Sequence, residues 1–417
     1  MARSYGNGSI EERDGKFRLR YRLNGKTMSK TLGDHIKTKR EAREELRKLL
    51  KAKDDGMAVE PTKLTVAKWI EQWIASGAPG PKNRTKVGQR TLERYEQLLN
   101  EHVIPALGTT AMQALQSTAI DKLYASLEAK VAAGRMAPRT TRHVHVVFNS
   151  CLGTAVRKKL IAVNPMLFVE QLPNPNPKPA DLDDEDEGDD HQEGLSEAEL
   201  GKLVAGFKPS SLYPLIVLAA ATGARRNELL ALRWTDLDVA KKTIRIERAW
   251  EHTKRFGLRL KAPKSARGFR TIGLDDATLG VLLAEMRKHQ QLMAGIPDGA
   301  DVDLSLVKLP PKALMFPAAP DIGQDFVLTA PRMPRNVSKE FRRKADLLGF
   351  GIKLHTLRGI HATGLLDAGI PVHIVAERIG DDPATLLRWY TKRKRSQTAN
   401  ETVSAALTTL TAGFLKS

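Results

Sequence analysis

Three short clusters in the second half of the sequence combine cationic side chains with a candidate nucleophile. Arg225 lies in the segment Thr-Gly-Ala-Arg-Arg-Asn-Glu-Leu, and Glu228 follows three residues later, a spacing that puts both on one helix face. His355 and Arg358 have the same spacing in the second cluster. The third cluster ends in Leu-Arg-Trp-Tyr at Tyr390. Taken singly, each cluster has an ordinary explanation as a surface ion pair or as amphipathic helix packing.

Together, these residue types suit an attack on a phosphodiester. The phosphoryl group is already anionic and repels nucleophiles, so two guanidiniums such as Arg225 and Arg358 would neutralise its non-bridging oxygens. A phenol has a pKa of about 10, and Tyr390 therefore needs a base or a positive field to attack at neutral pH. His355 can accept or share that proton, and Glu228 can orient the arginine. This chemistry requires no metal ion.

The sequence also predicts the elements that position these residues. An apolar run over residues 215–221 predicts a helix that ends at Gly223, immediately before the first cluster. Asp382 as N-cap and Pro383 at the first helical position predict a short helix that ends at Tyr390. Ser196, with a glutamate three residues on, predicts a capping box at the start of this region. Strands are predicted near residues 243–247, 258–261 and 269–274.

Composition indicates a polyanionic partner. The chain has 417 residues and a formal net charge of +19, and such an excess either repels itself or meets DNA, RNA or an anionic membrane. The longest apolar stretch is shorter than the roughly 20 residues that span a bilayer, and the N-terminus has no apolar signal-peptide core. Cys151 is the single cysteine, which excludes an internal disulfide and a thiolate zinc cluster. We expect a cytoplasmic protein.

The first 57 residues predict a small sheet with one helix. Residues 16–22 alternate apolar and basic side chains, so that one face can pack while the other carries charge. Asn24-Gly25 is a strong hairpin signal, a second strand follows over 26–32, and residues 37–50 have a charged helical pattern. The charged face is either an ordinary solvated surface or a face that enters a DNA groove. In the second case the contacts come from Arg18, Arg20 and Arg22.

Residues 64–170 predict a helical bundle with basic joints. An apolar stripe at helical spacing comprises Val144, Val147, Phe148, Cys151, Leu152 and Ala155. The joints contribute the candidate DNA contacts Lys82, Arg84, Lys86, Arg139 and Arg142. A linker follows, in which prolines alternate with polar residues and eight of the ten residues 181–190 are acidic. A run this dense is typical of a solvated tether rather than a metal site.

The three clusters, in this order and with these intervals, resemble the tyrosine recombinases, and specifically the phage integrases. The Thr-Gly-Ala-Arg-Arg-Asn-Glu-Leu segment resembles the family's first-arginine box, and His-Thr-Leu-Arg resembles its His-x-x-Arg box. Gly380, ten residues before Tyr390, matches the family's spacing to the nucleophile. The family's lysine lies on a β-hairpin turn between the two arginines. By resemblance this lysine is Lys264, with Lys261 as the alternative.

The resemblance implies a multidomain, mainly α protein with small β-sheets. Its expected parts are an arm-type DNA-binding domain (residues 1–57, a three-stranded sheet plus a helix), a helical core-binding domain (62–172), the Pro-rich and acidic linker (173–194), an α+β catalytic domain (195–395) and a C-terminal segment (396–417) that packs on a neighbouring protomer. The implied reaction is integration or excision of a mobile element through a 3′-phosphotyrosyl link at Tyr390, without metal, ATP or another cofactor. Lys264 would protonate the leaving 5′ oxygen.

The implied partners are double-stranded DNA at core-type and arm-type sites and three further copies of the chain, which form a homotetramer around a Holliday junction. A DNA-bending host factor and a directionality factor would be further partners. One alternative is a DNA-binding regulator of the same fold with weakened catalysis. Another is a relaxing topoisomerase of similar chemistry, which would need neither the basic N-terminal sheet nor a second DNA-binding domain.

The sequence departs from the family at two positions near the proposed nucleophile and base. The family usually has His or Trp directly after the glycine, as a hydrogen-bond donor beside the scissile phosphate, whereas this chain has Asp381. The residue after Arg358, commonly His in the family, is Gly359, and His361 is expected to be a packing residue. A carboxylate beside a phosphate is unfavourable, so we expect it to be turned away, protonated or bonded to an arginine. Asp381→His should leave cleavage equal or faster.

Deleting residues 181–190 should strengthen non-specific DNA binding at low salt, because an acidic tether competes with DNA for the basic surfaces. A fluorescence-anisotropy titration with a random duplex measures the change, which should fade as salt rises. A variant with a Gly/Ser segment of equal length in place of 181–190 separates charge from linker length. An unchanged affinity in both variants would contradict the prediction.

Overall fold

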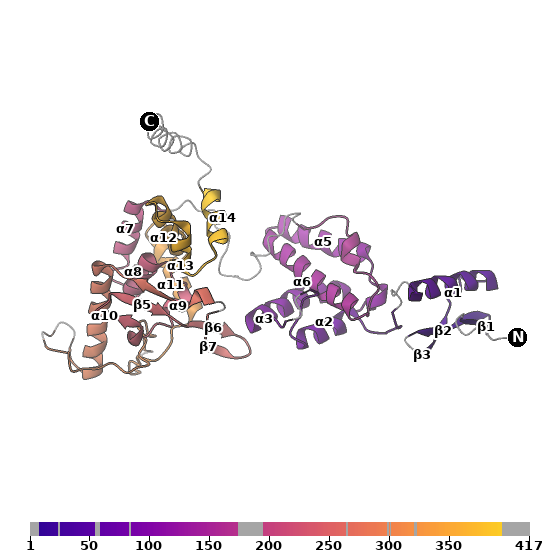
Figure 1. Ribbon diagram of the computed structural model, residues 1–417, viewed down its shortest axis with the longest axis horizontal. Coiled ribbons are helices and arrows are strands. Elements are labelled where there is room, and N and C mark those ends of the chain that lie inside the picture. Colours follow the sequence, from indigo (N-terminus) through magenta and orange to yellow (C-terminus); the bar gives the residue numbers. More distant parts are fainter. Residues whose placement is uncertain are drawn as a thin grey trace, which may run out of the picture. The chain divides into compact units, whose positions relative to one another are not determined.

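The computed structural model describes residues 8–23, 26–54, 59–82, 85–173, 195–263, 266–297, 300, 302–320 and 323–393. The chain divides into two compact units, Met1–Asp184 and Glu185–Ser417 (Figure 1). The predicted turn at residues 24–25, Arg84, the acidic run and the apolar C-terminal segment lie outside the described residues. Within those residues, no helix is both long and apolar enough to cross a membrane.

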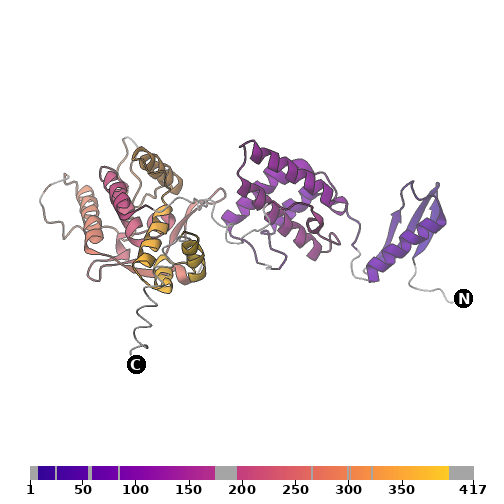
Figure 2. The ribbon, with the colours of Figure 1, turned by 90° about the horizontal axis from the view of Figure 1, so that it is seen from above.

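A three-stranded sheet and one helix form the start of the first unit. Strands β1 (Ser9–Arg13), β2 (Lys16–Leu23) and β3 (Lys26–Thr31) pair antiparallel in that order, and α1 (Lys39–Asp54) lies across one face (Figure 2). Side chains along β2 alternate in burial, as predicted. The buried set, which packs with Ala42 and Leu46 of α1, is Phe17, Leu19, Tyr21 and Leu23. The opposite face carries Arg18, Arg20 and Arg22, which are exposed or half-exposed.

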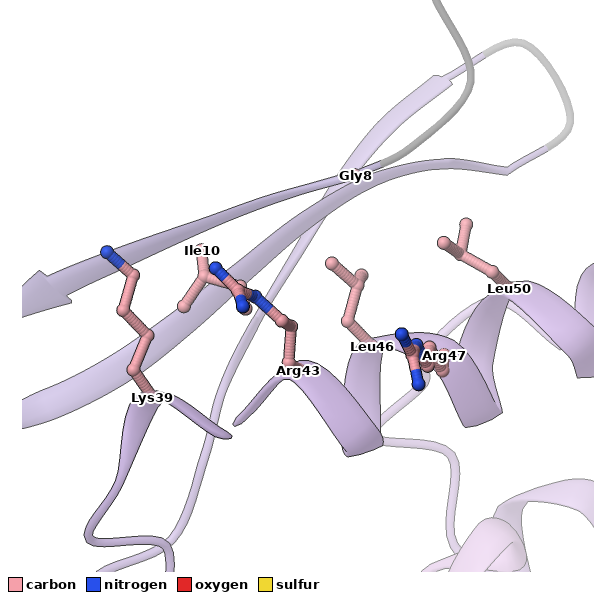
Figure 3. Close-up of a pocket in the computed structure, with 7 residues that line it drawn as sticks. All are labelled: Gly8, Ile10, Lys39, Arg43, Leu46, Arg47 and Leu50. Carbon is pink, nitrogen blue, oxygen red and sulfur yellow. The ribbon is translucent and has the colours of Figure 1, made fainter. Parts of the chain in front are cut away.

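A hollow of about 430 Å³ lies between β1 and α1 (Figure 3). Its apolar lining comes from Ile10, Leu46 and Leu50, with the backbone of Gly8 beside them. Helix α1 also contributes a basic row spaced four residues apart, which consists of Lys39, Arg43 and Arg47. Lys39 and Arg43 reach from the helix toward the strand that carries Ile10 (Figure 3). The positive charge of this module is therefore present on its helix as well as on its sheet.

A helical bundle makes up the rest of the first unit. It comprises α2 (Val66–Ala75), α3 (Gln89–Leu98), a π-helical turn (Leu99–Val103), α4 (Ile104–Leu107), α5 (Ser117–Ala132) and α6 (Pro138–Arg157). The predicted stripe of α6 is confirmed, because every member from Val144 to Ala155 is buried in one core. The Trp69 indole of α2 donates to the Cys151 carbonyl at 3.2 Å and locks α2 onto α6.

The basic joints of this bundle differ in exposure. Lys82 and Lys86 are exposed, and Arg139 is half-buried. Arg142, by contrast, retains only 8% exposure. Little of the Arg142 side chain therefore faces solvent, so its proposed DNA contact has the weakest geometric support of the four.

The second unit surrounds a buried helix, α8 (Tyr213–Thr222), which supplies Leu215, Ile216 and Leu218 to its main core. The other helices are α7 (Glu197–Gly206), α9 (Arg226–Leu229), α10 (Asp276–Ala294), α11 (Pro334–Leu347), α12 (Thr356–Asp367), α13 (Val372–Ile379) and α14 (Pro383–Arg393). Helix α7 begins with the predicted capping box between Ser196 and Glu199. One sheet has the strand order β4 (Leu237–Asp238), β5 (Thr243–Ile246), β8 (Arg270–Gly273), and β6 (Ala249–Thr253) forms a separate hairpin with β7 (Gly257–Lys261).

A smaller core fixes α14, the helix that contains the candidate nucleophile. Leu386 of α14 is buried together with Ala362 of α12 and with Val375, Ala376 and Ile379 of α13. The Asp382 carboxylate accepts from the Ala384 backbone N–H at 2.9 Å, which is the predicted cap at the start of α14. The start of α14 is thus fixed by its cap, and Leu386 packs the helix against α12 and α13.

Candidate active site

Arg225 is placed by the end of one helix and the start of the next. Helix α8 ends at Gly223, which has φ +62°, and a Cβ added there would lie 2.8 Å from the His361 ring. The chain then turns, and Arg225 becomes the N-cap of α9 in an extended conformation. Glu228, at the third helical position, accepts from the Arg225 backbone N–H at 2.9 Å and lies 3.4 Å from its Nη1. The predicted Arg–Glu contact therefore forms, but as a helix cap rather than along a helix face.

Glu228 is itself held by a buried arginine from β8. Arg270 Nη2 donates to Glu228 Oε2 at 2.7 Å, and both side chains are about 5% exposed. Burial on its own would raise the pKa of Glu228, but the hydrogen bonds and charge of Arg270, with the charge of Arg225, hold that pKa below its ordinary value. Glu228 is thus an ionised carboxylate between two arginines.

Arg358 reaches the same region from α12. Its Nη1 donates to the Gly223 carbonyl at 2.8 Å and to the Ile379 carbonyl at 2.7 Å. Only 6% of the residue is exposed. Burial, together with the charge of Arg225, lowers the pKa of Arg358 to about 10, which leaves it charged at neutral pH. The two arginines of the sequence clusters are therefore neighbours.

Asp381 lies between these two arginines. Arg358 Nη2 donates to Asp381 Oδ2 at 3.1 Å, and Arg225 Nη2 lies 3.9 Å from Asp381 Oδ1. Of the three arrangements expected for this carboxylate, the structure has the one in which it is bonded to an arginine.

Gly380 permits these groups to meet. It ends α13 with φ +70°, and its carbonyl accepts from Arg225 Nη1 at 3.2 Å. A Cβ at this position would lie 2.8 Å from Arg270 Nη1 and 3.0 Å from the Arg267 carbonyl. Any other residue would push β8 and its preceding turn away from the end of α13.

The turn before β8 also contacts the start of the tyrosine helix. Arg267 Nη1 donates to the Asp382 carboxylate, and this hydrogen bond holds the pKa of Asp382 below its ordinary value. The turn carries the predicted catalytic lysine, Lys264, which lies outside the described residues. Lys261, the alternative, donates to Glu251 at 3.0 Å on the β6–β7 hairpin. Glu251 also accepts from Arg259. Lys261 is therefore part of an ion-pair cluster on the hairpin.

The structure describes less of the predicted base, His355, and of the predicted nucleophile, Tyr390. His355 is the N-cap of α12 and is half-buried, and its carbonyl accepts from the Arg358 backbone N–H at 3.0 Å. Tyr390 lies within α14, but its side chain is outside the described residues. His361 accepts from Arg378 Nε at 3.1 Å, and burial with the charge of Arg378 lowers its pKa to about 4. His361 is therefore a neutral packing residue at physiological pH, as expected from its position in the sequence.

Two arginines that organise the site are absent from the set predicted from sequence. Arg270 Nε donates to the Arg378 carbonyl at 2.9 Å, and Arg378 Nη2 donates to the Ala221 carbonyl at 3.0 Å. Arg270 could have been found from periodicity, because it is in phase with the buried Ile272 on a predicted strand and so had to be buried with a partner. Arg378 gives no comparable signal.

The phage integrase family model matches residues 195–397. Residues 195–397 belong to the phage integrase family of tyrosine recombinases. This family is a class of enzymes that act on DNA.

The chain has several curated relatives. An integrase of Streptomyces ambofaciens is 30% identical over 198 residues, which cover 48% of this chain and 45% of the relative. An integrase of Saccharopolyspora erythraea is 24% identical over 409 residues, covering 85% of each chain. The match thus spans about half the length of the first relative and most of the second.

Solved structures of other recombinases share the fold. The Tn1549 transposon integrase in complex with a circular intermediate DNA has a TM-score of 0.60 at 16% identity, over 82% of this chain and 99% of that one. A lambda integrase tetramer bound to a Holliday junction gives 0.52 at 16% identity, over 95% and 98%.

Glu228→Gln should destabilise the protein by roughly 3–5 kcal/mol, because it leaves Arg270 buried without its anion. Because the pKa of Glu228 is lowered in the folded state, this stability is present at neutral pH and is lost as the pH falls below the ordinary value of 4.5. Urea unfolding at pH 7 measures the change. Asp346→Asn, which removes the exposed Arg342–Asp346 pair, is the matched control and should cost no more than about 1 kcal/mol. Equal losses in the two variants would contradict the assignment.

Proposed function

We propose that this protein is a site-specific DNA recombinase, an integrase, that cleaves and rejoins DNA through a 3′-phosphotyrosyl intermediate at Tyr390. The observation that carries this proposal is the convergence of Arg225 and Arg358 on one anionic group. That group, the Asp381 carboxylate, lies two residues before the helix in which Tyr390 lies. Two converging guanidiniums match the two non-bridging oxygens of a phosphodiester.

The proposed reaction proceeds in two balanced steps. The Tyr390 phenol oxygen attacks phosphorus, its proton passes to His355, and the bond to the 5′ oxygen breaks as that oxygen takes a proton from Lys264. A 5′-hydroxyl of another strand then attacks the phosphotyrosine and gives its proton to Lys264, while the Tyr390 oxygen leaves and takes back the proton from His355. The number of phosphoester bonds is the same before and after, so the exchange needs no ATP. Arg225 and Arg358 bind the oxygens on which negative charge grows, and each such donor is worth about 10²–10³ in rate.

The DNA and the assembly are proposed by likeness to the relatives, whose structures include an integrase on a circular intermediate DNA and a tetramer on a Holliday junction. We infer that four copies act on core-type sites and that the N-terminal sheet binds arm-type sites in the cytoplasm. Residues 396–417 would pack on a neighbouring copy, and a DNA-bending factor and a directionality factor would assist. The proposed contacts are Arg18, Arg20, Arg22, Lys82, Arg84, Lys86, Arg139 and Arg142.

Tyr390→Phe should abolish the covalent protein–DNA adduct, because it removes the attacking oxygen and keeps the ring. Sequencing the ends of adducts trapped on genomic DNA identifies a core site, and a nicked suicide duplex of that site gives a labelled adduct on a denaturing gel. Tyr213→Phe, which removes a hydroxyl at the start of α8, is the control and should cleave as wild type does. Failure of the wild type to form any adduct, with specific DNA binding intact, would favour the regulator alternative.

Arg358→Lys should slow single-turnover cleavage of the same duplex by about 10²–10³, because an ammonium cannot replace a planar fork that also donates to two carbonyls. The rate of adduct formation at saturating DNA measures this effect. DNA affinity at the core site should change much less than the rate. If the variant forms the adduct at the wild-type rate, Arg358 does not have the proposed role in cleavage.

A further inference from the structure

The Asp381 carboxylate presents its two oxygens to two different guanidiniums. Oδ2 accepts from Arg358 Nη2 at 3.1 Å, and Oδ1 lies 3.9 Å from Arg225 Nη2. About a third of the Asp381 side chain is exposed, whereas Arg358 is almost fully buried. The carboxylate therefore contacts the buried Arg358 and is itself partly open to solvent, as Arg225 is.

The charge balance explains why an anion is needed there. Arg225 and Arg358 repel each other, and the charge of Arg225 contributes to the lowered pKa of Arg358. Among the described residues, Glu228 and Asp381 are carboxylates that both stabilise the charge of Arg358. Glu228 also shares a buried ion pair with Arg270. Asp381 therefore adds to Glu228 a second negative charge that offsets the repulsion between the two arginines.

A carboxylate and a phosphodiester offer these arginines the same pattern, because each has one negative charge shared by two oxygens. We propose that Asp381 is an internal substitute for the scissile phosphate, which it must vacate when DNA binds. This inference rests on the proposed phosphate-binding role of the two arginines. It goes beyond that role, because it assigns to Asp381 the control of access to the site.

The surrounding backbone allows the carboxylate to leave without unfolding the loop. The Asp381 N–H donates to the Ala376 carbonyl at 2.9 Å, so the backbone is anchored independently of the side chain. Oδ1 also accepts from the Asp382 N–H at 3.1 Å, one residue before α14 begins. A displaced carboxylate thus retains a donor at the helix start, where the helix dipole favours negative charge. Displacement of the Asp381 carboxylate would therefore move its negative charge away from the arginines and toward the helix that contains Tyr390.

A titration of the DNA-free protein with inorganic phosphate, at constant ionic strength, tests the inference. If the carboxylate occupies the arginines in about nine molecules of ten, it weakens the apparent phosphate affinity about tenfold. Asp381→Asn should therefore unfold at a lower temperature than wild type without phosphate, and bind phosphate about tenfold more tightly. The midpoint of thermal unfolding as a function of phosphate concentration gives both quantities.

The controls separate occupancy of the site from other effects of the substitution. Asp346→Asn removes a carboxylate that also accepts from an arginine, Arg342, but on the exposed surface of α11, and should leave both quantities at their wild-type values. Adding Arg225→Gln to Asp381→Asn should remove the gain in phosphate affinity. If Asp381→Asn does not fold, Asp381→His, which restores the residue usual in the family, replaces it in the same titration.

An unchanged phosphate affinity in the Asp381 variant would overturn the inference. So would a gain in affinity that survives Arg225→Gln, because the added phosphate would then be bound elsewhere. The titration involves no DNA cleavage, so its result is independent of whether the protein forms a phosphotyrosyl adduct. With the suicide duplex, Asp381→His should cleave at least as fast as wild type, and a collapse of cleavage would show that Asp381 assists the chemistry instead.

Discussion

Guanidinium groups that converge on one point repel one another, and the second unit depends on how it holds them there. The ends of two helices supply most of the answer. Helices α8 and α13 both terminate at a glycine in the left-handed conformation, and the carbonyls at a helix C-terminus carry partial negative charge. The arginines that donate to carbonyls at these two ends are Arg225, Arg270, Arg358 and Arg378. The apolar helices that form the cores thus also provide the electrostatic frame of the site.

The hydrogen bonds to these carbonyls determine which nitrogen of each arginine faces the Asp381 carboxylate. Arg358 uses Nη1 for two carbonyls and Arg225 uses Nη1 for the Gly380 carbonyl, while Nη2 of both points to the Asp381 carboxylate. Donors fixed in this way need no reorganisation when charge develops on a bound phosphate, which is the condition under which such donors are most effective. These rigid supports fix the positions of side chains that are otherwise long and flexible, as the proposed catalysis requires.

Sequence patterns predicted the elements of this site better than its internal contacts. The capping signals of Ser196 and Asp382 and the alternation along β2 are local, and the structure has them as predicted. The contacts of Arg358 and Arg378 could not be predicted, because their acceptors are backbone carbonyls, which every residue possesses. Arg142 shows another limit of local patterns, since no sequence signal distinguishes this buried arginine from the exposed Lys82 and Lys86 of the same joints.

Asp381 stands where the family usually has a neutral donor, and under the proposed function this changes how strongly the site binds any anion. A His or Trp at this position would add a hydrogen bond for any phosphate that enters. A carboxylate instead imposes a free-energy cost on every anion, because the entering group must first displace it. This cost lowers the affinity for a free phosphate ion and for a phosphate in a bound duplex by the same factor. A free phosphate ion makes few contacts, so the lowered affinity leaves it mostly unbound, whereas a correctly bound duplex is also held by the rest of the DNA interface and stays bound. In this proposal the carboxylate keeps adventitious anions out of the site and stabilises the arginine pair while no DNA is bound.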